Sequence, residues 1–194
     1  MIEGYKAFRE RYATGDGSIM RRLSEHGQQP EIMVVACSDS RVDPTLILQC
    51  DPGELFTVRN VANIIPPFEK DEKHHGTSAA LEFGICHLNV KHLILLGHSQ
   101  CGGMQALLSG IPEGSDDFIS AWVSAVDLNK DAIKSADELS QASLIHSYKN
   151  CLSFPWIKER IEQNKLKISL WYFDIKKGEI QAYNPSDKKF HPLS

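Results

Sequence analysis

Four apolar-rich runs occur along the chain, and each predicts a strand. They lie at residues 32–36, 55–59, 93–97 and 166–174. Apolar runs without polar alternation are typical of parallel strands that are covered on both faces of a sheet. A turn at residues 176–179 leads into a further short strand at residues 180–183, which we expect to pair antiparallel at the edge.

Between these runs, apolar residues recur at helical spacing and predict helices. The predicted helices cover residues 43–49, 76–88, 102–109, 118–126, 132–139, 141–151 and 155–163, with a loop at residues 111–117. On the helix at residues 76–88, we expect Leu81, Phe83 and Gly84 to face the core. Strands that alternate with helices predict an α/β fold: a mostly parallel central sheet with an antiparallel edge strand, flanked by helices.

The N-terminal residues are mostly charged, with few apolar residues among them. Tyr5, Phe8 and Tyr12 recur at helical spacing among charged residues, and Gly15-Asp16-Gly17 interrupts the pattern. We therefore expect two short amphipathic helices. Their apolar surface is too small to fold alone, so residues 1–194 are expected to form a single domain in which residues 1–27 are an arm packed on the core or on a neighbouring subunit.

Composition and charge exclude several classes of protein. A chain of 194 residues with 42% hydrophobic and 24% charged residues fits one globular domain. Its net charge of −4 and scattered basic residues argue against a nucleic-acid partner. No apolar run is long enough for a membrane span, and the first residues lack the apolar core of a secretory signal, so we expect a cytoplasmic protein. Five widely spaced cysteines indicate free thiols rather than a disulfide framework.

Polar side chains follow the first and third apolar runs, where each predicted strand ends. Cys37, Asp39 and Arg41 follow the first run, and His98 and Cys101 follow the third. The carboxyl ends of parallel strands border the ligand crevice of such folds. Zinc in catalytic sites is commonly held by three cysteine or histidine ligands. A His-x-x-Cys pair is a weak signal alone, but its coincidence with a strand-end cysteine predicts a zinc site.

Asp39 and Arg41 alternate with Cys37 and so point to the same side of an extended segment. A strand-end salt bridge is one interpretation. In another, Arg41 aims an ionised Asp39 at a metal-bound water. Asp39 can also bind the metal directly and close the site, and the residues alone do not choose among these arrangements.

Three blocks of sequence resemble the β-class carbonic anhydrases. They are CSDSRV at residues 37–42, PGELF with RNVAN between residues 52 and 63, and GHSQCGG at residues 97–103. The resemblance implies one Zn²⁺ per subunit on Cys37, His98 and Cys101, with Asp39 and Arg41 as a catalytic dyad beside it. It also implies a homodimer or a larger, even-numbered homo-oligomer, because active sites in this family lie at the subunit interface.

Within that family the chain is most similar to the plant-type branch. This implies that Gln28 donates to bound bicarbonate, that Phe56 and Val61 form an apolar wall for carbon dioxide, and that Gly102 contacts substrate. Two positions differ from family patterns. Phe83 stands where plant-type members have tyrosine, and Val34 stands where bicarbonate-inhibited bacterial members have tryptophan. We therefore expect the open arrangement, with Asp39 on Arg41 and water on zinc.

The implied activity is that of a lyase, the reversible hydration of carbon dioxide to bicarbonate and a proton by zinc-bound hydroxide. Three other hypotheses remain. The same zinc site can hydrolyse a carbon dioxide analogue such as carbonyl sulfide or carbon disulfide. It can be a non-catalytic zinc site closed by Asp39. A cysteine can instead act as a nucleophile with His98 as its base.

Overall fold

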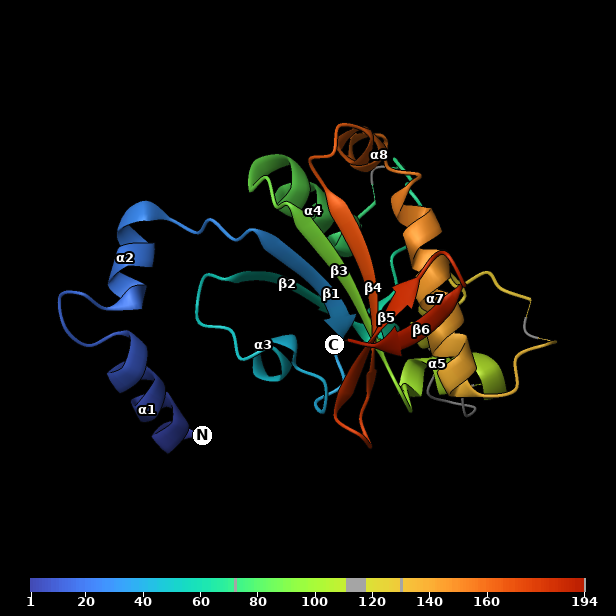
Figure 1. Cartoon of the computed structure of the whole chain (residues 1–194), viewed down its shortest axis with the longest axis horizontal. Coiled ribbons are helices and arrows are strands. Elements are labelled where there is room, and N and C mark those ends of the chain that lie inside the picture. Colours follow the sequence, from blue (N-terminus) through green and yellow to red (C-terminus); the bar gives the residue numbers. More distant parts are fainter. Residues whose placement is uncertain (72, 111–117, 130, 194) are drawn as a thin grey trace.

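A six-stranded sheet forms the centre of the protein, as Figure 1 shows for the computed structural model. The structure describes residues 1–71, 73–110, 118–129 and 131–193. The strands are β1 (Ile32–Cys37), β2 (Leu55–Asn60), β3 (His92–His98), β4 (Lys167–Asp174), β5 (Glu179–Asn184) and β6 (Lys189–Pro192). Their order is β2-β1-β3-β4-β5-β6. The first four are parallel, whereas β5 and β6 pair antiparallel, so the predicted α/β class is confirmed.

Helices connect the parallel strands, as the sequence predicted. They are α1 (Ile2–Tyr12), α2 (Ile19–His26), α3 (Pro44–Ile47), α4 (Gly76–Glu82), α5 (Gly102–Ser109), α6 (Ile119–Val123), α7 (Ala136–Cys151) and α8 (Pro155–Glu162). A 3₁₀ turn at Val61–Asn63 follows β2, and a π-helical turn at Phe83–His87 extends α4. None of the helices in the described part of the chain is long and apolar enough to cross a membrane.

Three predictions about these elements were wrong. Residues 132–135 precede α7, because the Ser135 hydroxyl accepts the N–H of Glu138 and so begins the helix there. The two helices expected at 132–139 and 141–151 form one helix, α7. β6 adds a second antiparallel strand that the sequence analysis did not predict. The loop expected at residues 111–117 lies outside the described residues.

The two faces of the sheet differ in what covers them. One face, with Met33 and Leu95, packs against apolar side chains of α4, α7 and α8. On the other face, the apolar cluster around Val34 and Ile94 contains only side chains of the strands β1 to β4. Helices therefore cover one face of the parallel sheet, whereas on the other face the buried side chains of Val34 and Ile94 pack with those of neighbouring strands.

The side chain of Phe83 does not face the core as expected, since it is 45% exposed. Leu81, Gly84 and Ile85 are buried, which is the i, i+3, i+4 spacing of one helix face, and Phe83, two residues after Leu81, points away from that face. Phe83 lies on the surface near Phe56, with their ring centroids 5.8 Å apart.

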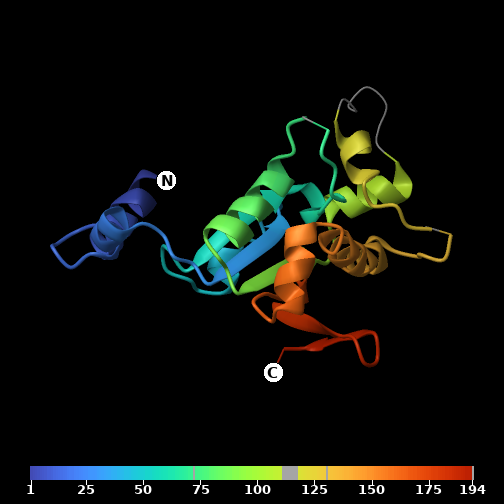
Figure 2. The ribbon, with the colours of Figure 1, turned by 90° about the horizontal axis from the view of Figure 1, so that it is seen from above.

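The N-terminal arm, residues 1–27, extends away from the sheet, as Figures 1 and 2 show. Neither α1 nor α2 contains a buried residue. A hydrogen bond from the Tyr12 hydroxyl to Asp51 Oδ1, at 2.8 Å, ties the arm to the turn before β2. Both helices were predicted, and in the single chain their apolar side chains are either exposed or only partly buried.

Candidate metal centre

Cys37, His98 and Cys101 converge at the carboxyl edge of the sheet. Cys37 is the last residue of β1, His98 is the last residue of β3, and Cys101 directly precedes α5. β2 lies on one side of β1 and β3 lies on the other. Successive strands are therefore added on opposite sides of β1, although all three strands are parallel. Ligands of α/β proteins bind at such a switch point.

The three side chains are close enough for one metal ion. Their ligand atoms all lie within 4.8 Å of one another, all three residues are buried, and no second group of this kind was found in the described residues. His98 Nδ1 lies 2.8 Å from the carbonyl oxygen of Ser99, whereas the buried Nε2 has no hydrogen-bond partner among the described residues. A proton on Nδ1 leaves the Nε2 lone pair free for a metal. Two sulfur donors and one imidazole nitrogen are a donor set that suits zinc.

The two cysteine thiols differ in acidity. The contact with Cys101 lowers the pKa of the Cys37 thiol, and the contact with His98 lowers it further. The same contact and burial raise the pKa of Cys101, because two neighbouring thiolates repel each other. The N–H of Ala62 also donates to Cys37 Sγ at 3.3 Å. This arrangement favours a thiolate on Cys37, which is the form that binds metals.

Asp39 and Arg41 form a two-pronged ion pair next to this group. Arg41 Nη2 lies 2.7 Å from Asp39 Oδ2, and Arg41 Nε lies 3.0 Å from Oδ1. The backbone N–H of Arg41 donates to the same Oδ1 at 2.9 Å. These bonds hold the pKa of the Asp39 carboxyl well below its usual range, mainly through the Arg41 side chain. Asp39 is therefore ionised, engaged with Arg41 and outside the converging Cys-His-Cys group.

Arg59 braces the loop that carries this pair. Its Nε donates to the Cys37 carbonyl at 3.0 Å and its Nη2 donates to the Asp39 carbonyl at 2.7 Å. From the sequence, Arg59 could equally contact a site carboxylate or brace the loop. The contacts assign the bracing role.

Gln100 links the two halves of the site, although nothing in the sequence marked it as a site residue. Arg41 Nη2 donates to the Gln100 carbonyl at 3.2 Å, and the Gln100 N–H donates to Asp137 Oδ1 at 2.6 Å. Gln100 also has a left-handed backbone, with φ of 56°. No local pattern pairs Gln100 with Asp137, so only the fold shows this contact.

Two of the four predicted substrate residues lie beside the Cys-His-Cys group. Val61 precedes Ala62, the donor to Cys37, and Gly102 follows Cys101. The indole N–H of Trp122 donates to the Val61 carbonyl at 2.7 Å and holds it there. Val61 and Gly102 therefore lie next to the residues of the Cys-His-Cys group.

The other two predicted substrate residues, Gln28 and Phe56, lie at the opposite end of the sheet. Gln28 precedes β1, and Cys37 ends that strand, so a rise of about 3.3 Å per residue puts about 16 Å of strand between them. Phe56 pairs with Met33 near the start of β1. A single chain does not bring either residue to the site.

Comparison with known proteins gives a consistent result. A family model described as carbonic anhydrase matches residues 32–180. β-Carbonic anhydrase 5 of Arabidopsis thaliana, a chloroplast protein, is 36% identical over 186 residues, which cover 90% of this chain. A carbonic anhydrase of Synechocystis is 33% identical and covers 95% of this chain and 70% of its own length. The chain spans only 61% of the length of the Arabidopsis protein.

Solved structures of related proteins share the whole fold. The β-carbonic anhydrase CcaA superimposes with a TM-score of 0.86 at 32% identity, over 100% of this chain and 90% of that one. A tetrameric β-carbonic anhydrase from Sordaria macrospora gives a TM-score of 0.76 at 33% identity, over 93% of this chain and 90% of that one. On the family match and these relatives, the chain belongs to the carbonic anhydrase family, in its β class.

Proposed function

We propose that this protein catalyses the reversible hydration of carbon dioxide to bicarbonate and a proton, with one zinc ion per chain on Cys37, His98 and Cys101. The observation that carries the proposal is the convergence of these three buried side chains beside an Asp39 that is already paired with Arg41. Three protein ligands leave a fourth position of a tetrahedral zinc for water or substrate. The family match supports the same reaction.

When bound, zinc supplies the Lewis acidity that lets water act as a nucleophile near neutral pH. The chain provides the rest. Asp39 accepts a hydrogen bond from the attacking water and orients it, since a carboxylate oxygen can accept more than one hydrogen bond. Arg41 keeps Asp39 ionised and fixes its direction through bonds of 2.7 and 3.0 Å. Val61 offers an apolar wall against which carbon dioxide can lie, and Gly102 leaves open space beside Cys101.

We further propose that the active enzyme is a homodimer or a larger, even-numbered homo-oligomer in which a second copy supplies Gln28 and Phe56. Both lie at the wrong end of the sheet to reach the site of their own chain. In this proposal residues 1–194 form one domain, and the arm packs on the neighbouring copy. The arm has no buried residue and exposes Tyr5 and Phe8, which supports such packing.

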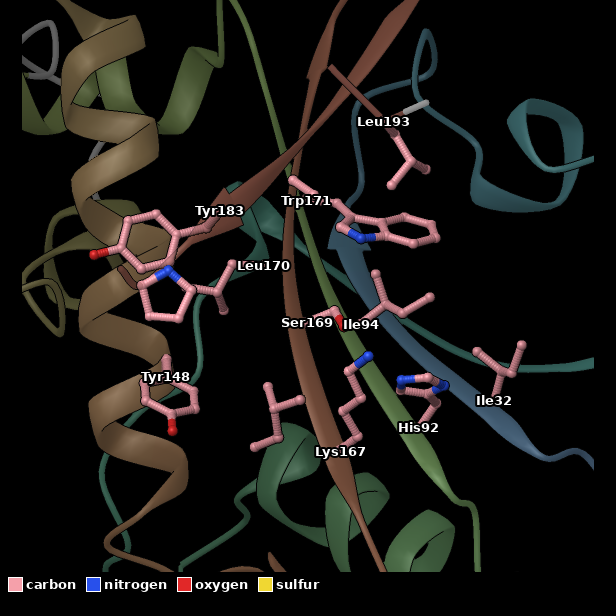
Figure 3. A pocket seen from close by; sticks show the side chains of 13 residues that line it. Ile32, His92, Ile94, Tyr148, Lys167, Ser169, Leu170, Trp171, Tyr183 and Leu193 are labelled. Carbon is pink, nitrogen blue, oxygen red and sulfur yellow. The ribbon is translucent and has the colours of Figure 1, made fainter. Parts of the chain in front are cut away.

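A cavity lined mainly by apolar side chains is suited to packing against a second copy. Figure 3 shows Ile32, Ile94 and Trp171 of the strands and Tyr148 of α7 among the residues around this cavity of about 570 Å³. The tetrameric relative from Sordaria macrospora supports an even-numbered assembly. We also propose a reducing compartment such as the cytoplasm, because all five cysteines are free and two must remain available as ligands.

Stopped-flow measurement of carbon dioxide hydration, on protein of known zinc content, tests the proposed reaction. We expect fast hydration at both neutral and alkaline pH, and none in Cys101→Ala. Activity at alkaline pH alone would show that Asp39 closes the site at neutral pH. Zinc at full occupancy without hydration would contradict the proposal and favour a carbon dioxide analogue or a non-catalytic site. Activity that resists a strong chelator would favour a cysteine nucleophile.

A further inference from the structure

We propose that Asp137 is a positioning residue of this site. By holding the backbone of Gln100, it fixes the segment between His98 and Cys101 and keeps Arg41 directed at Asp39. The inference rests on the proposed function, because it assigns Asp137 to the same zinc site. Asp137 is not one of the Cys-His-Cys group, and its contact with the loop is the hydrogen bond to Gln100. Burial raises the pKa of the Tyr172 hydroxyl, and the Asp137 carboxylate next to that hydroxyl helps to raise it further.

The contact between Asp137 and Gln100 is short and joins distant parts of the chain. Asp137 lies in the first turn of α7, and its Oδ1 accepts the N–H of Gln100 at 2.6 Å. Acceptors with a negative charge make the stronger hydrogen bonds of proteins. An anionic side chain is also favoured in the first turn of a helix, where the helix dipole is positive. Asp137 is thus well suited to anchor the loop.

The backbone of Gln100 explains why the loop needs an anchor. Its φ of 56° lies in the left-handed region, which residues other than glycine and asparagine rarely adopt. In this conformation its N–H points to Asp137 while its carbonyl oxygen accepts from Arg41 Nη2 at 3.2 Å. The side-chain oxygen of Gln100 also faces Arg41 Nη1, at 3.4 Å. A change in this backbone would therefore move the acceptors that direct Arg41.

The same helix holds the other end of the segment. The hydroxyl of Ser140 donates to the His98 carbonyl at 3.0 Å. A Cβ at position 97 would lie 3.0 Å from Leu144 Cδ1, so Gly97 lets β3 approach α7 closely. Helix α7 thus contacts the His98–Cys101 segment at two points, one next to each ligand. The spacing between the two ligands depends on both contacts.

Three variants separate this role from a general effect on α7. Asp137→Ala removes the acceptor, and Asp137→Asn keeps an oxygen at the same position without the charge. Ser135→Ala is the matched control, since Ser135 caps the same helix but its hydroxyl bonds to Glu138 rather than to the loop. Zinc affinity is measured by competition with a chelator, and kcat and KM for carbon dioxide are measured at saturating zinc.

We expect Asp137→Ala to weaken zinc binding and to lower kcat, each about tenfold, with KM nearly unchanged, as for residues that orient metal ligands. Asp137→Asn should recover most of both losses, and Ser135→Ala should show neither. The proposal is overturned if Asp137→Ala binds zinc and turns over like wild type. It is equally overturned if Ser135→Ala loses as much as Asp137→Ala, because the cause would then be the start of the helix. Zinc affinity can be compared among the variants even if the wild-type protein does not hydrate carbon dioxide. A failure of the proposed reaction is therefore distinguished from a failure of the role proposed for Asp137.

Discussion

Arg59 of β2 and Asp43, the residue that caps α3 in the connection before that strand, are joined by an ion pair of 2.7 Å between Nη1 and Oδ2. The pair leaves the other guanidinium nitrogens to hold the carbonyl oxygens of Cys37 and Asp39. We expect Arg59→Ala to lower the free energy of unfolding by about 2–4 kcal/mol, because three buried or half-buried acceptors lose a charged donor. Urea denaturation measures this change.

Arg59→Lys is the informative comparison for that prediction. Lysine keeps the charge near Asp43 but cannot present three donors in a fixed plane. It should therefore recover less than half of the lost stability. Full recovery by lysine would show that the charge alone matters and that the carbonyl contacts contribute little.

Loss of a ligand should remove the metal without unfolding the chain. Cys101→Ala and His98→Ala leave two of the three donors, so we expect zinc to fall below about one tenth of the wild-type content after dialysis. The matched control is Cys151→Ala, which removes an equally buried sulfur far from the group. That variant should keep full zinc and lose only about 1–2 kcal/mol of stability. Metal analysis and thermal unfolding distinguish these results, and zinc retention in Cys101→Ala would remove Cys101 from the ligand set.

Asp39→Asn should separate zinc binding from turnover. The amide keeps the size of the side chain but loses the charge that Arg41 holds in place. We expect zinc content to stay at the wild-type level and kcat to fall about 100-fold, the size of effect typical for loss of a group that orients and accepts a reacting proton. Wild-type kcat in this variant would show that Asp39 is only a partner of Arg41.

Gly103 and Gly102 should differ in their tolerance of a methyl group. A Cβ at Gly103 would lie 2.8 Å from Ala62 Cβ and 2.9 Å from Val61 Cγ1, whereas one at Gly102 would meet nothing within 4 Å. We expect Gly103→Ala to cost about 1–3 kcal/mol of stability through overpacking. Gly102→Ala should be as stable as wild type. Equal unfolding midpoints for the two variants would show that α5 can shift away from Val61.

The arm offers a test of assembly that leaves the core untouched. Phe8 is 41% exposed in the single chain, so Phe8→Asp should not unfold the protein. If the arm packs on a second copy, the new charge would be buried there, and we expect sedimentation velocity to show a smaller assembly. Lys6→Gln changes the net charge by the same amount and sign on a different face of α1. It should leave the size unchanged, and a similar shift in both variants would exclude packing through the apolar face.

The parallel sheet and the metal group were predictable because their signals are local. The apolar runs end at Cys37 and just before His98, and short-range spacing adds Cys101. Other features depend on contacts between distant segments. β6 is a four-residue strand in which only Phe190 is partly buried, so its own pattern is too weak to predict it. Phe83 was misplaced because its apolar side chain was assigned to the core face, although helical spacing from Leu81 puts Gly84 and Ile85 on that face instead.

The hydrogen bonds among the loops around the site could not be predicted from the sequence either, because they also join distant segments of the chain. Gln100 resembles an ordinary loop residue until its backbone dihedral and its contact with Asp137 are known. The positions of Gln28 and Phe56 raise a different difficulty. Their expected role at the site requires a second copy, so neither the sequence pattern nor the fold of one chain can place them there.

The switch point between β1 and β3 also bears on the order in which parts of the site form during folding. Cys37 and His98 are distant along the chain but end adjacent parallel strands. Their pairing closes a long stretch of chain, and contacts of this kind form slowly, so we expect the ligand set to be completed late in folding. The rate at which zinc is taken up during refolding should therefore report when the centre of the sheet has formed.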